Sequence, residues 1–213
     1  MFATYELSDP QVNAKGGRFC PLSDGKKAAF LFPEGQLYAP FGGPSTYDGG
    51  AYTPRQTLEL RCDEELTGIM KEFDLWAITY LEANAERLFK KKLSKKQLSE
   101  GYKSPMHQKG DYAPNLRCKI DLEGRMACRY WTPNAIETMP PDDYKACDLR
   151  VRLLIRSMWF MQQTFGFTLQ LTDIQLFPRA PVCPFKSLES ESGPFSKQSC
   201  EEEDDVSIEE AQS

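Results

Sequence analysis

Arginines and large aromatic residues share one stretch of the sequence, residues 149–177, and both residue types can bind a polyanion. The first half of this stretch carries Arg150, Arg152 and Arg156 and runs into Trp159 and Phe160. Guanidinium groups bind phosphates, and aromatic rings offer faces on which nucleobases stack. Side chains of both kinds on one face therefore favour a surface that binds a single-stranded polyanion.

The same stretch predicts two long strands joined by a short turn at 162–164. Its second half begins with FGF and continues with Leu169, Leu171, Ile174 and Leu176. Apolar residues that alternate with polar ones are typical of a strand with one buried face and one solvated face. The arginines of the first strand are thus expected to lie on the solvated face of a hairpin.

A second hairpin is expected to carry more basic residues. The segment LRCKID, 116–121, places Arg117 and Lys119 on the face opposite its apolar side chains. A tight turn at 123–124 is predicted to return the chain as a partner strand that ends in RYW, 129–131. This hairpin would extend the basic surface of the first one.

The run KKKLSKK, residues 90–96, allows two interpretations, which stay open equally. It is either a set of phosphate contacts or a solvated basic helix end that resembles a nuclear-localisation run. The residues expected to bind nucleic acid are Lys90, Lys91, Lys92, Lys95, Lys96, Lys103, Lys109, Tyr112, Arg117, Lys119, Arg129, Tyr130, Trp131, Arg150, Arg152, Arg156, Trp159 and Phe165.

Each aromatic residue in that set has a structural alternative, because aromatic side chains fill cores more often than they meet ligands. For Trp159, core packing and ligand contact stay open equally. For Trp131, the neighbouring Arg129 and Tyr130 favour ligand contact. Trp76 lies in a helical pattern and is predicted to anchor the core.

Charge is distributed unevenly along the chain, although the net charge is only −5. Residues 87–157 hold 16 lysines and arginines against 8 acidic residues, a local charge of +8. Residues 187–213 hold one lysine against nine acidic residues, a local charge of −8. A basic middle followed by an acidic tail favours nucleic-acid binding, since the tail can occupy the basic surface when no ligand is bound.

The pattern of elements predicts a mainly β protein with one main helix. Asp63 is expected to cap that helix, which runs to about Phe89, and Ser94 with Gln97 forms a capping box for a second, short helix. Five to seven strands with one sizeable helix fit a five-stranded or slightly larger antiparallel barrel of the OB-fold kind. A β-sandwich is the structural alternative.

The chain is expected to consist of one OB-fold-like domain, 1–182, and a disordered acidic tail, 183–213, which has too few apolar residues to fold. The Gly-, Pro- and Tyr-rich segment 34–54 excludes helix. It is either a mobile loop over the binding face or ordinary strand-and-turn packing.

Signatures of catalysis and cofactor binding are missing. The sequence lacks a phosphate-binding loop, a nucleophile elbow and an H-E-x-x-H motif, and it has a single histidine, His107. We therefore predict neither catalytic activity nor a cofactor nor a metal site. Seven widely spaced cysteines without C-x-x-C predict reduced thiols. No signal peptide or transmembrane segment is recognisable, so an intracellular protein of the nucleus or cytoplasm, without a membrane partner, is expected.

Three passages in a fixed order carry a resemblance to a known family: FKKKLS (89–94), YKSPMHQKGDYAPNLRCKI (102–120) and LLIRSMWFMQQTFGFTLQLTDIQLFPRA (153–180). They resemble the OB-fold single-stranded-DNA-binding proteins of phages and of large DNA viruses of eukaryotes. There are departures: Phe89-Lys90, Ala113-Pro114 and Thr168-Leu169 stand where Phe-Gly, Pro-Pro and a tryptophan are usual. The tail also lacks the terminal aromatic residue of the phage members, which argues against a phage-like docking onto a polymerase.

The resemblance implies a protein that binds single-stranded DNA without sequence preference in viral-type replication, recombination or repair, coating and protecting exposed strands. The tail is expected to compete with DNA for the basic groove and to recruit replication proteins. Its acidic run is Glu201, Glu202, Glu203, Asp204 and Asp205. A homodimer is left open. Two alternatives remain: an RNA-binding OB module, and an interaction protein whose basic face meets an acidic protein partner.

Overall fold

The computed structural model describes residues 2–46 and 51–179, so the expected tail lies outside the described residues. Thirteen strands form one sheet, and five of them have seven residues or more. The strands are β1 (Tyr5–Leu7), β2 (Gln11–Val12), β3 (Arg18–Asp24), β4 (Lys27–Ala28), β5 (Phe30–Leu31), β6 (Arg55–Arg61), β7 (Tyr102–Lys103), β8 (Met106–His107), β9 (Asn115–Asp121), β10 (Arg129–Trp131), β11 (Glu137–Thr138), β12 (Cys147–Met161) and β13 (Thr164–Pro178). The helices are α1 (Glu64–Ala83), α2 (Ala85–Phe89), α3 (Lys95–Gly101) and the 3-10 helix η1 (Tyr144–Ala146).

The β12–β13 hairpin is the longest feature of the sheet, as predicted. Its strands have 15 residues each, and the ladder runs from the Cys147–Pro178 pair to the Met161–Thr164 pair. Gln162 and Gln163 form the turn, in which Gln162 has a φ of 54°. Two register shifts, after Arg152 and after Ile155, mark bulges that bend a long ladder.

The sheet continues on both sides of this hairpin in the order β1-β3-β12-β13-β10-β11. β9 also pairs with β13, in parallel, and carries β6 and β8 as antiparallel neighbours. The ladders leave the sheet open. Single bridges link Leu37 to Leu149 of β12 and Tyr38 to Arg61 of β6. A mainly β protein is confirmed, and the number of strands is larger than predicted because many are only two or three residues long.

The predicted hairpin between 116–121 and the strand ending at 131 is wrong. β9 pairs with β13 at Gln170 and Leu171, and β10 pairs in parallel with the same strand from Asp173 onward. The chain loops out between the two and returns where the Cys128 N–H donates to the Asp121 carbonyl at 2.8 Å. Both segments therefore occupy one edge of β13, which is long enough for both.

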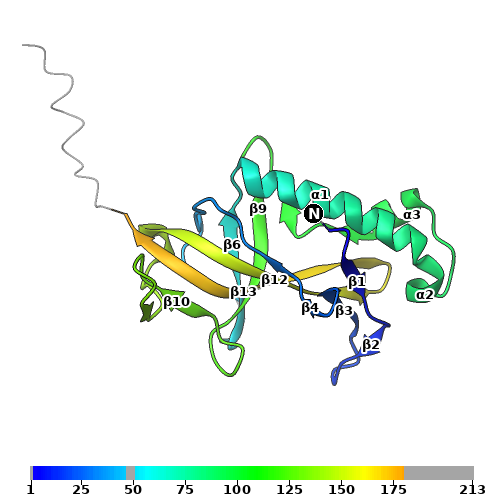
Figure 1. Cartoon of the computed structure of the whole chain (residues 1–213), viewed down its shortest axis with the longest axis horizontal. Helices are drawn as coiled ribbons and strands as arrows, with labels where there is room; N and C mark the ends of the chain where they lie inside the picture. Colours follow the sequence, from blue (N-terminus) through cyan, green and yellow to red (C-terminus); the bar gives the residue numbers. More distant parts are fainter. Residues whose placement is uncertain (1, 47–50, 180–213) are drawn as a thin grey trace, which may run out of the picture. The chain divides into compact units, whose positions relative to one another are not determined.

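The main helix begins as predicted and ends earlier. The Asp63 carboxylate accepts a hydrogen bond from the Leu66 N–H at 2.8 Å, which satisfies a free amide of the first turn. α1 stops at Ala83, and Asn84 separates it from α2. The predicted capping box of Ser94 and Gln97 is present at the start of α3. Figure 1 shows α1 alongside the long hairpin, with α2 and α3 near the hairpin tip.

β1, β2 and β3 were not predicted, because residues 1–25 are polar and rich in turn residues. β3 nevertheless pairs with β12 from Ser157 to Phe160. Phe2 packs edge-on against Phe73 of α1, with 5.3 Å between ring centroids, and Trp76 stacks on Phe73 at 5.4 Å. Trp76 is thus packed against the core, as expected.

The segment 34–54 is described except for residues 47–50, and its described part follows the packing interpretation. Leu37 and Ala39 are buried, and Ser45 bridges Thr57 of β6. Five cysteines are buried with free thiols in the described part: Cys20, Cys62, Cys118, Cys128 and Cys147. No helix among the described residues is both long and apolar enough to span a bilayer.

Candidate nucleic-acid interface

Basic and polar side chains cover the surface of β6 and β9 that faces away from the core. The two strands pair so that Lys119 lies opposite Thr57 and Arg117 opposite Glu59. The Lys119 ammonium donates a hydrogen bond to Thr57 Oγ1 at 2.8 Å. Arg117 Nη2 lies 3.1 Å from Glu59 Oε1, and His107 Nε2 lies 3.4 Å from the other oxygen of that carboxylate. Glu59 therefore holds Arg117 and His107 side by side.

A hollow of about 330 Å³ lies where this surface meets the tip of the long hairpin. The side chains that could bind a nucleotide there are Lys103, Ser104, His107, Arg117, Lys119 and Trp159. The Trp159 indole lies against Gly166, since a β-carbon at Gly166 would come within 2.9 Å of the ring. Glycine at this position lets a half-buried tryptophan border a pocket whose lining combines the cations Lys103, Arg117 and Lys119 with apolar side chains. We call this pocket the first hollow.

A chain of polar contacts crosses the sheet next to the first hollow. Gln170 of β13 is fully buried, and its carbonyl oxygen accepts a hydrogen bond from Arg156 Nη1 at 2.7 Å. Its amide nitrogen donates to Asp121 Oδ2 at 2.8 Å. The other oxygen of Asp121 lies 3.7 Å from Arg55 Nε. This relay joins β12, β13, β9 and β6 and fixes two arginines on the same surface.

Asp173 organises a third group of cations farther along the hairpin. Its Oδ1 lies 2.7 Å from Arg129 Nη2 and accepts a hydrogen bond from the Trp131 indole at 3.2 Å, while Oδ2 lies 3.3 Å from Arg152 Nη1. The Arg152 guanidinium lies 3.8 Å from the centroid of the Phe30 ring. Contacts of this kind hold a guanidinium plane in a fixed orientation.

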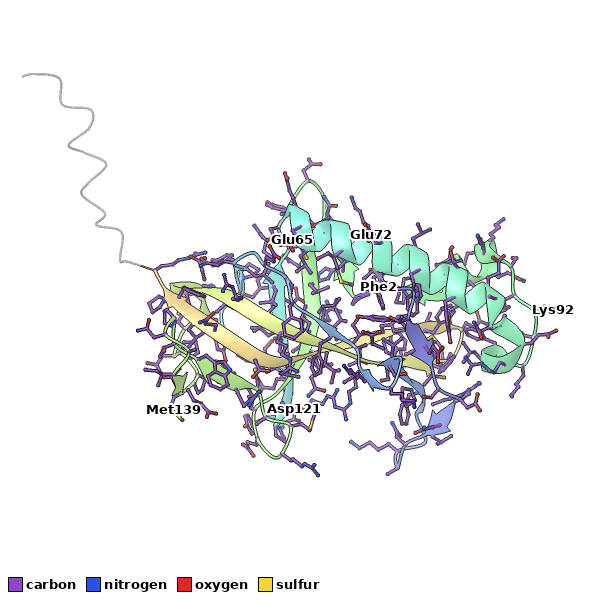
Figure 2. The ribbon with its side chains drawn as sticks, in the orientation of Figure 1. Phe2, Glu65, Glu72, Lys92, Asp121 and Met139 are labelled. Carbon is purple, nitrogen blue, oxygen red and sulfur yellow. The ribbon has the colours of Figure 1, made fainter. Side chains whose placement is uncertain are left out.

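These three groups lie on one face of the sheet. Allowing for the two bulges, Trp159, Arg156 and Arg152 project from the side of β12 opposite the buried Leu149, Val151 and Leu153. We call this surface the basic face and define it by its charged and aromatic members: Arg55, Lys103, Arg117, Lys119, Arg129, Trp131, Arg152, Arg156 and Trp159. In Figure 2, Asp121 lies at the lower side of the sheet, away from Glu65 and Glu72 of α1.

Cations exceed carboxylates on the basic face. Seven lysines and arginines face three carboxylates, Glu59, Asp121 and Asp173, which leaves an excess of four positive charges. In the described part of the chain, no carboxylate pairs with Lys103, Lys119 or Arg156. Burial lowers the pKa of Lys119, and the charges of Arg55 and Arg117 lower it further. A bound phosphate would relieve this repulsion.

Several predicted residues lie away from the basic face. Lys90, Lys91 and Lys92 belong to the α2–α3 connection, and Lys95 and Lys96 begin α3, at the end of the molecule where Figure 2 labels Lys92. Lys92 and Lys95 pair with Glu86 and Glu82 at 3.6 Å each. This position neither excludes phosphate contact nor joins these lysines to the first hollow.

Two predicted stacking residues are buried. Tyr130 is 6% exposed and its hydroxyl lies 2.6 Å from that of Tyr144, while Phe165 is 5% exposed and packs edge-on against Phe89. Their strands turn these side chains inward. Tyr112 is 71% exposed and, like Lys109, lies in the segment before β9. Arg150 lies over the Phe177 ring at 5.8 Å, beyond the Asp173 group.

Several members of the site were not predicted from the sequence. Arg55 is the first residue of β6, and its alternation with Thr57 and Glu59 was the available signal. Gln170, Asp121 and Asp173 carry no signal of their own, because a buried polar relay depends on which strands pair.

No family model and no curated protein matches the chain. Among solved structures, the single-stranded DNA-binding protein from bacteriophage Enc34 in complex with ssDNA is 11% identical, with a TM-score of 0.44, and the match covers 83% of this chain and 97% of that one. The single-stranded DNA binding protein gp2.5 of bacteriophage T7 is 11% identical, with a TM-score of 0.43, over 82% of this chain and 100% of that one. At this degree of similarity, function has to be inferred from the side chains of the protein itself.

Proposed function

We propose that the protein binds single-stranded DNA without sequence preference and that the basic face is the binding surface. The observation that carries the proposal is the first hollow, in which an indole ring lies beside lysines and an arginine. Single strands are held by cations along the backbone and by aromatic faces on which bases stack. A duplex would hide its base faces from such a site.

Each component of the basic face has a part in this proposal. Lys103, Lys119 and Arg156 have no carboxylate partner among the described residues, so they contact phosphates most readily. Trp159 stacks on a base. Stacking contributes roughly 1–3 kcal/mol per base and tolerates any base, which makes the binding independent of sequence.

We also propose an OB-like arrangement for the strands that carry this face. β12, β13, β9 and β6 follow one another by ladders, and the single bridges of Leu37 and Tyr38 connect β12 back to β6. In such small barrels, one face of the sheet and its loops bind oligonucleotides. In the cell, the protein would coat exposed strands during replication, recombination or repair and protect them from nucleases.

A fluorescence titration with oligo-dT tests the proposal. The chain has three tryptophans, and Trp76 packs against the core. Binding should quench the emission, and Trp159→Phe should abolish most of that quenching, while Trp76→Phe should leave it. Affinity should fall as salt rises, because each neutralised phosphate of a single strand contributes about −0.7 to the logarithmic slope. Absence of both quenching and binding would contradict the proposal.

Two alternatives are separable by related measurements. An RNA-binding protein would prefer oligo-rU over oligo-dT at matched salt, and the 2′-hydroxyl is the group that would distinguish them. An interaction protein for an acidic partner would show no quenching of Trp159 by oligo-dT. The basic face favours DNA over a protein partner because its cations surround an aromatic ring.

A further inference from the structure

A second hollow, of about 570 Å³, lies at the hairpin tip on the face opposite the first. It is bordered by β3, by the α2–α3 connection and by the turn of the long hairpin. The side chains that could meet a ligand are Arg18, Lys91, Gln97, Glu100, Phe160 and Gln163. None of these residues belongs to the basic face.

The two hollows lie on opposite sides of the β12–β13 hairpin. Trp159 borders the first and Phe160 borders the second, and consecutive residues of a strand point to opposite faces. On the neighbouring edge, Lys103 of β7 borders the first hollow and Gly101 borders the second. A DNA strand that leaves the first hollow at the hairpin tip therefore arrives at the second hollow by turning around the tip.

The second hollow has a floor for a base and cations for a phosphate. The Arg18 guanidinium lies 4.7 Å from the centroid of the Phe160 ring and donates a hydrogen bond to the Leu88 carbonyl. These contacts fix its plane, and a fixed guanidinium plane is a stacking surface. The Lys91 side chain is exposed at the rim. Glu100 is the carboxylate that opposes these two cations.

Amide groups complete the lining. Gln97, Gln162 and Gln163 border the hollow, and each side-chain amide can both donate and accept hydrogen bonds. The edge of any nucleobase combines donors and acceptors, so these amides suit a base without selecting one. Charge and continuity with the first hollow both favour a nucleotide over a peptide as the occupant.

We propose that the second hollow binds a nucleotide of the same DNA strand after the strand has turned around the hairpin tip. The proposal rests on the proposed single-stranded DNA function. It predicts that the protein gains affinity from nucleotides beyond those that fill the basic face. A short strand fills that face alone, and a longer one also reaches the second hollow.

Oligo-dT of two lengths and a matched pair of lysine variants test this. Lengths of about 5 and about 15 nucleotides lie near the limits of the site sizes known for such barrels. Lys91→Glu should weaken binding of the longer strand by about threefold to tenfold and lower its salt slope by about 0.7, with less than about twofold effect on the shorter strand. Lys92→Glu makes the same charge change one residue away, outside the second hollow, and should affect both lengths equally.

A second variant changes the charge of the second hollow in the opposite direction. Glu100→Gln removes the opposing carboxylate and should strengthen binding of the longer strand only. Lys91 and Glu100 are both exposed, so neither the Lys91→Glu nor the Glu100→Gln variant should disturb the fold. If Lys91→Glu behaves like Lys92→Glu at both lengths, the second hollow does not bind DNA, while the proposed function stands. If the unaltered protein binds neither strand, the proposed function fails as well.

Discussion

Lys119 is the lysine of the basic face on which burial and neighbouring positive charges act together. Its stem is partly buried on β9 and its ammonium contacts the Thr57 hydroxyl, with Arg55 and Arg117 as neighbouring charges. Burial and like charges both disfavour the protonated form, so the pKa of Lys119 lies below the ordinary lysine value of 10.5. A phosphate bound beside it would restore the charged form.

DNA binding should therefore weaken in alkaline solution, because Lys119 loses its proton there. As pH rises through the lowered pKa, the free protein loses this charge and affinity should fall by about tenfold to a hundredfold, the value of one charge-assisted contact. Lys119→Arg should remove the dependence, since a guanidinium stays protonated. Oligo-dA is the suitable probe, because thymine itself loses a proton in alkaline solution. Lys96→Arg, on an exposed lysine, serves as the control and should retain the pH dependence.

Gly166 is a residue at which one added carbon should matter. A β-carbon there would meet the Lys103 carbonyl oxygen at 2.4 Å and the Trp159 ring at 2.9 Å. Gly166→Ala should displace β7 and the indole and destabilise the protein by about 1–3 kcal/mol, as overpacking does. Urea denaturation measures the loss, and oligo-dT quenching of Trp159 should weaken with it.

Gly68→Ala is the matched control. Gly68 lies in α1 with nothing within 4 Å of its added carbon. Alanine favours helix over glycine by about 1 kcal/mol, so this variant should gain stability and leave DNA binding unchanged. A stable Gly166→Ala variant with normal quenching would show that the indole does not depend on this glycine.

At the scale of elements, the relay through Gln170 joins four strands by side chains as well as by backbone. The orientation of the Gln170 side-chain amide is set by its partners: the carbonyl oxygen faces Arg156 and the amide nitrogen faces Asp121. A buried polar group that loses its partner costs about 1–3 kcal/mol. The relay should therefore contribute both to stability and to the placement of two arginines.

A double-mutant cycle tests that coupling. Gln170→Leu, Arg156→Met and the double variant should be compared by urea denaturation. Residues in one hydrogen-bond network show coupling energies of about 0.5–3 kcal/mol, so the double variant should lose less than the sum of the single losses. Strict additivity would mean that the two side chains act independently.

Element prediction from the sequence succeeded where local patterns decide the structure. Alternation defined the long hairpin, and Asp63 with Ser94 defined two helix starts. The pairing of β9 with β6 and β13 was missed, because strand partners distant in sequence leave no local trace. Residues 1–25 are rich in polar and turn residues, and their strands are held by the pairing of β3 with β12 and by ring contacts to α1.

The site was predictable to the same extent. Arg117, Lys119 and Trp159 followed from alternation, and the structure brings them together. Tyr130 and Phe165 are buried because strand pairing sets the face that each takes: Tyr130 lies opposite Ile174, and Phe165 opposite Phe160. Arg55 and Gln170 joined the site only through strand pairing. Whether the lysines of 90–96 contact phosphate stays a prediction.

At the scale of the whole molecule, opposite charges are separated along the chain. The basic face lies in a domain whose following segment, 187–213, has a local charge of −8 from one lysine and nine acidic residues. An acidic segment tethered to a basic surface is at high effective concentration near it. It should compete with DNA as an intramolecular polyanion.

Deleting residues 187–213 should therefore tighten oligo-dT binding at low salt, by about tenfold, and the gain should shrink as salt screens the competition. Fluorescence anisotropy of labelled oligo-dT measures it. A full-length variant with Glu201, Glu202, Glu203, Asp204 and Asp205 neutralised to amides should reproduce part of the gain. Unchanged or weaker binding after truncation would rule out the competing tail.

The buried cysteines have a practical consequence for following the motions of this fold. Cys20 lies in β3, Cys118 in β9 and Cys147 in β12, while Cys62 directly follows β6. Burial raises the pKa of the Cys20 thiol to about 11 and that of Cys62 to about 12, so both resist alkylation in the native state. Pulsed alkylation read by mass spectrometry would time the local opening of individual strands, without any introduced label, and would show which of them DNA holds shut.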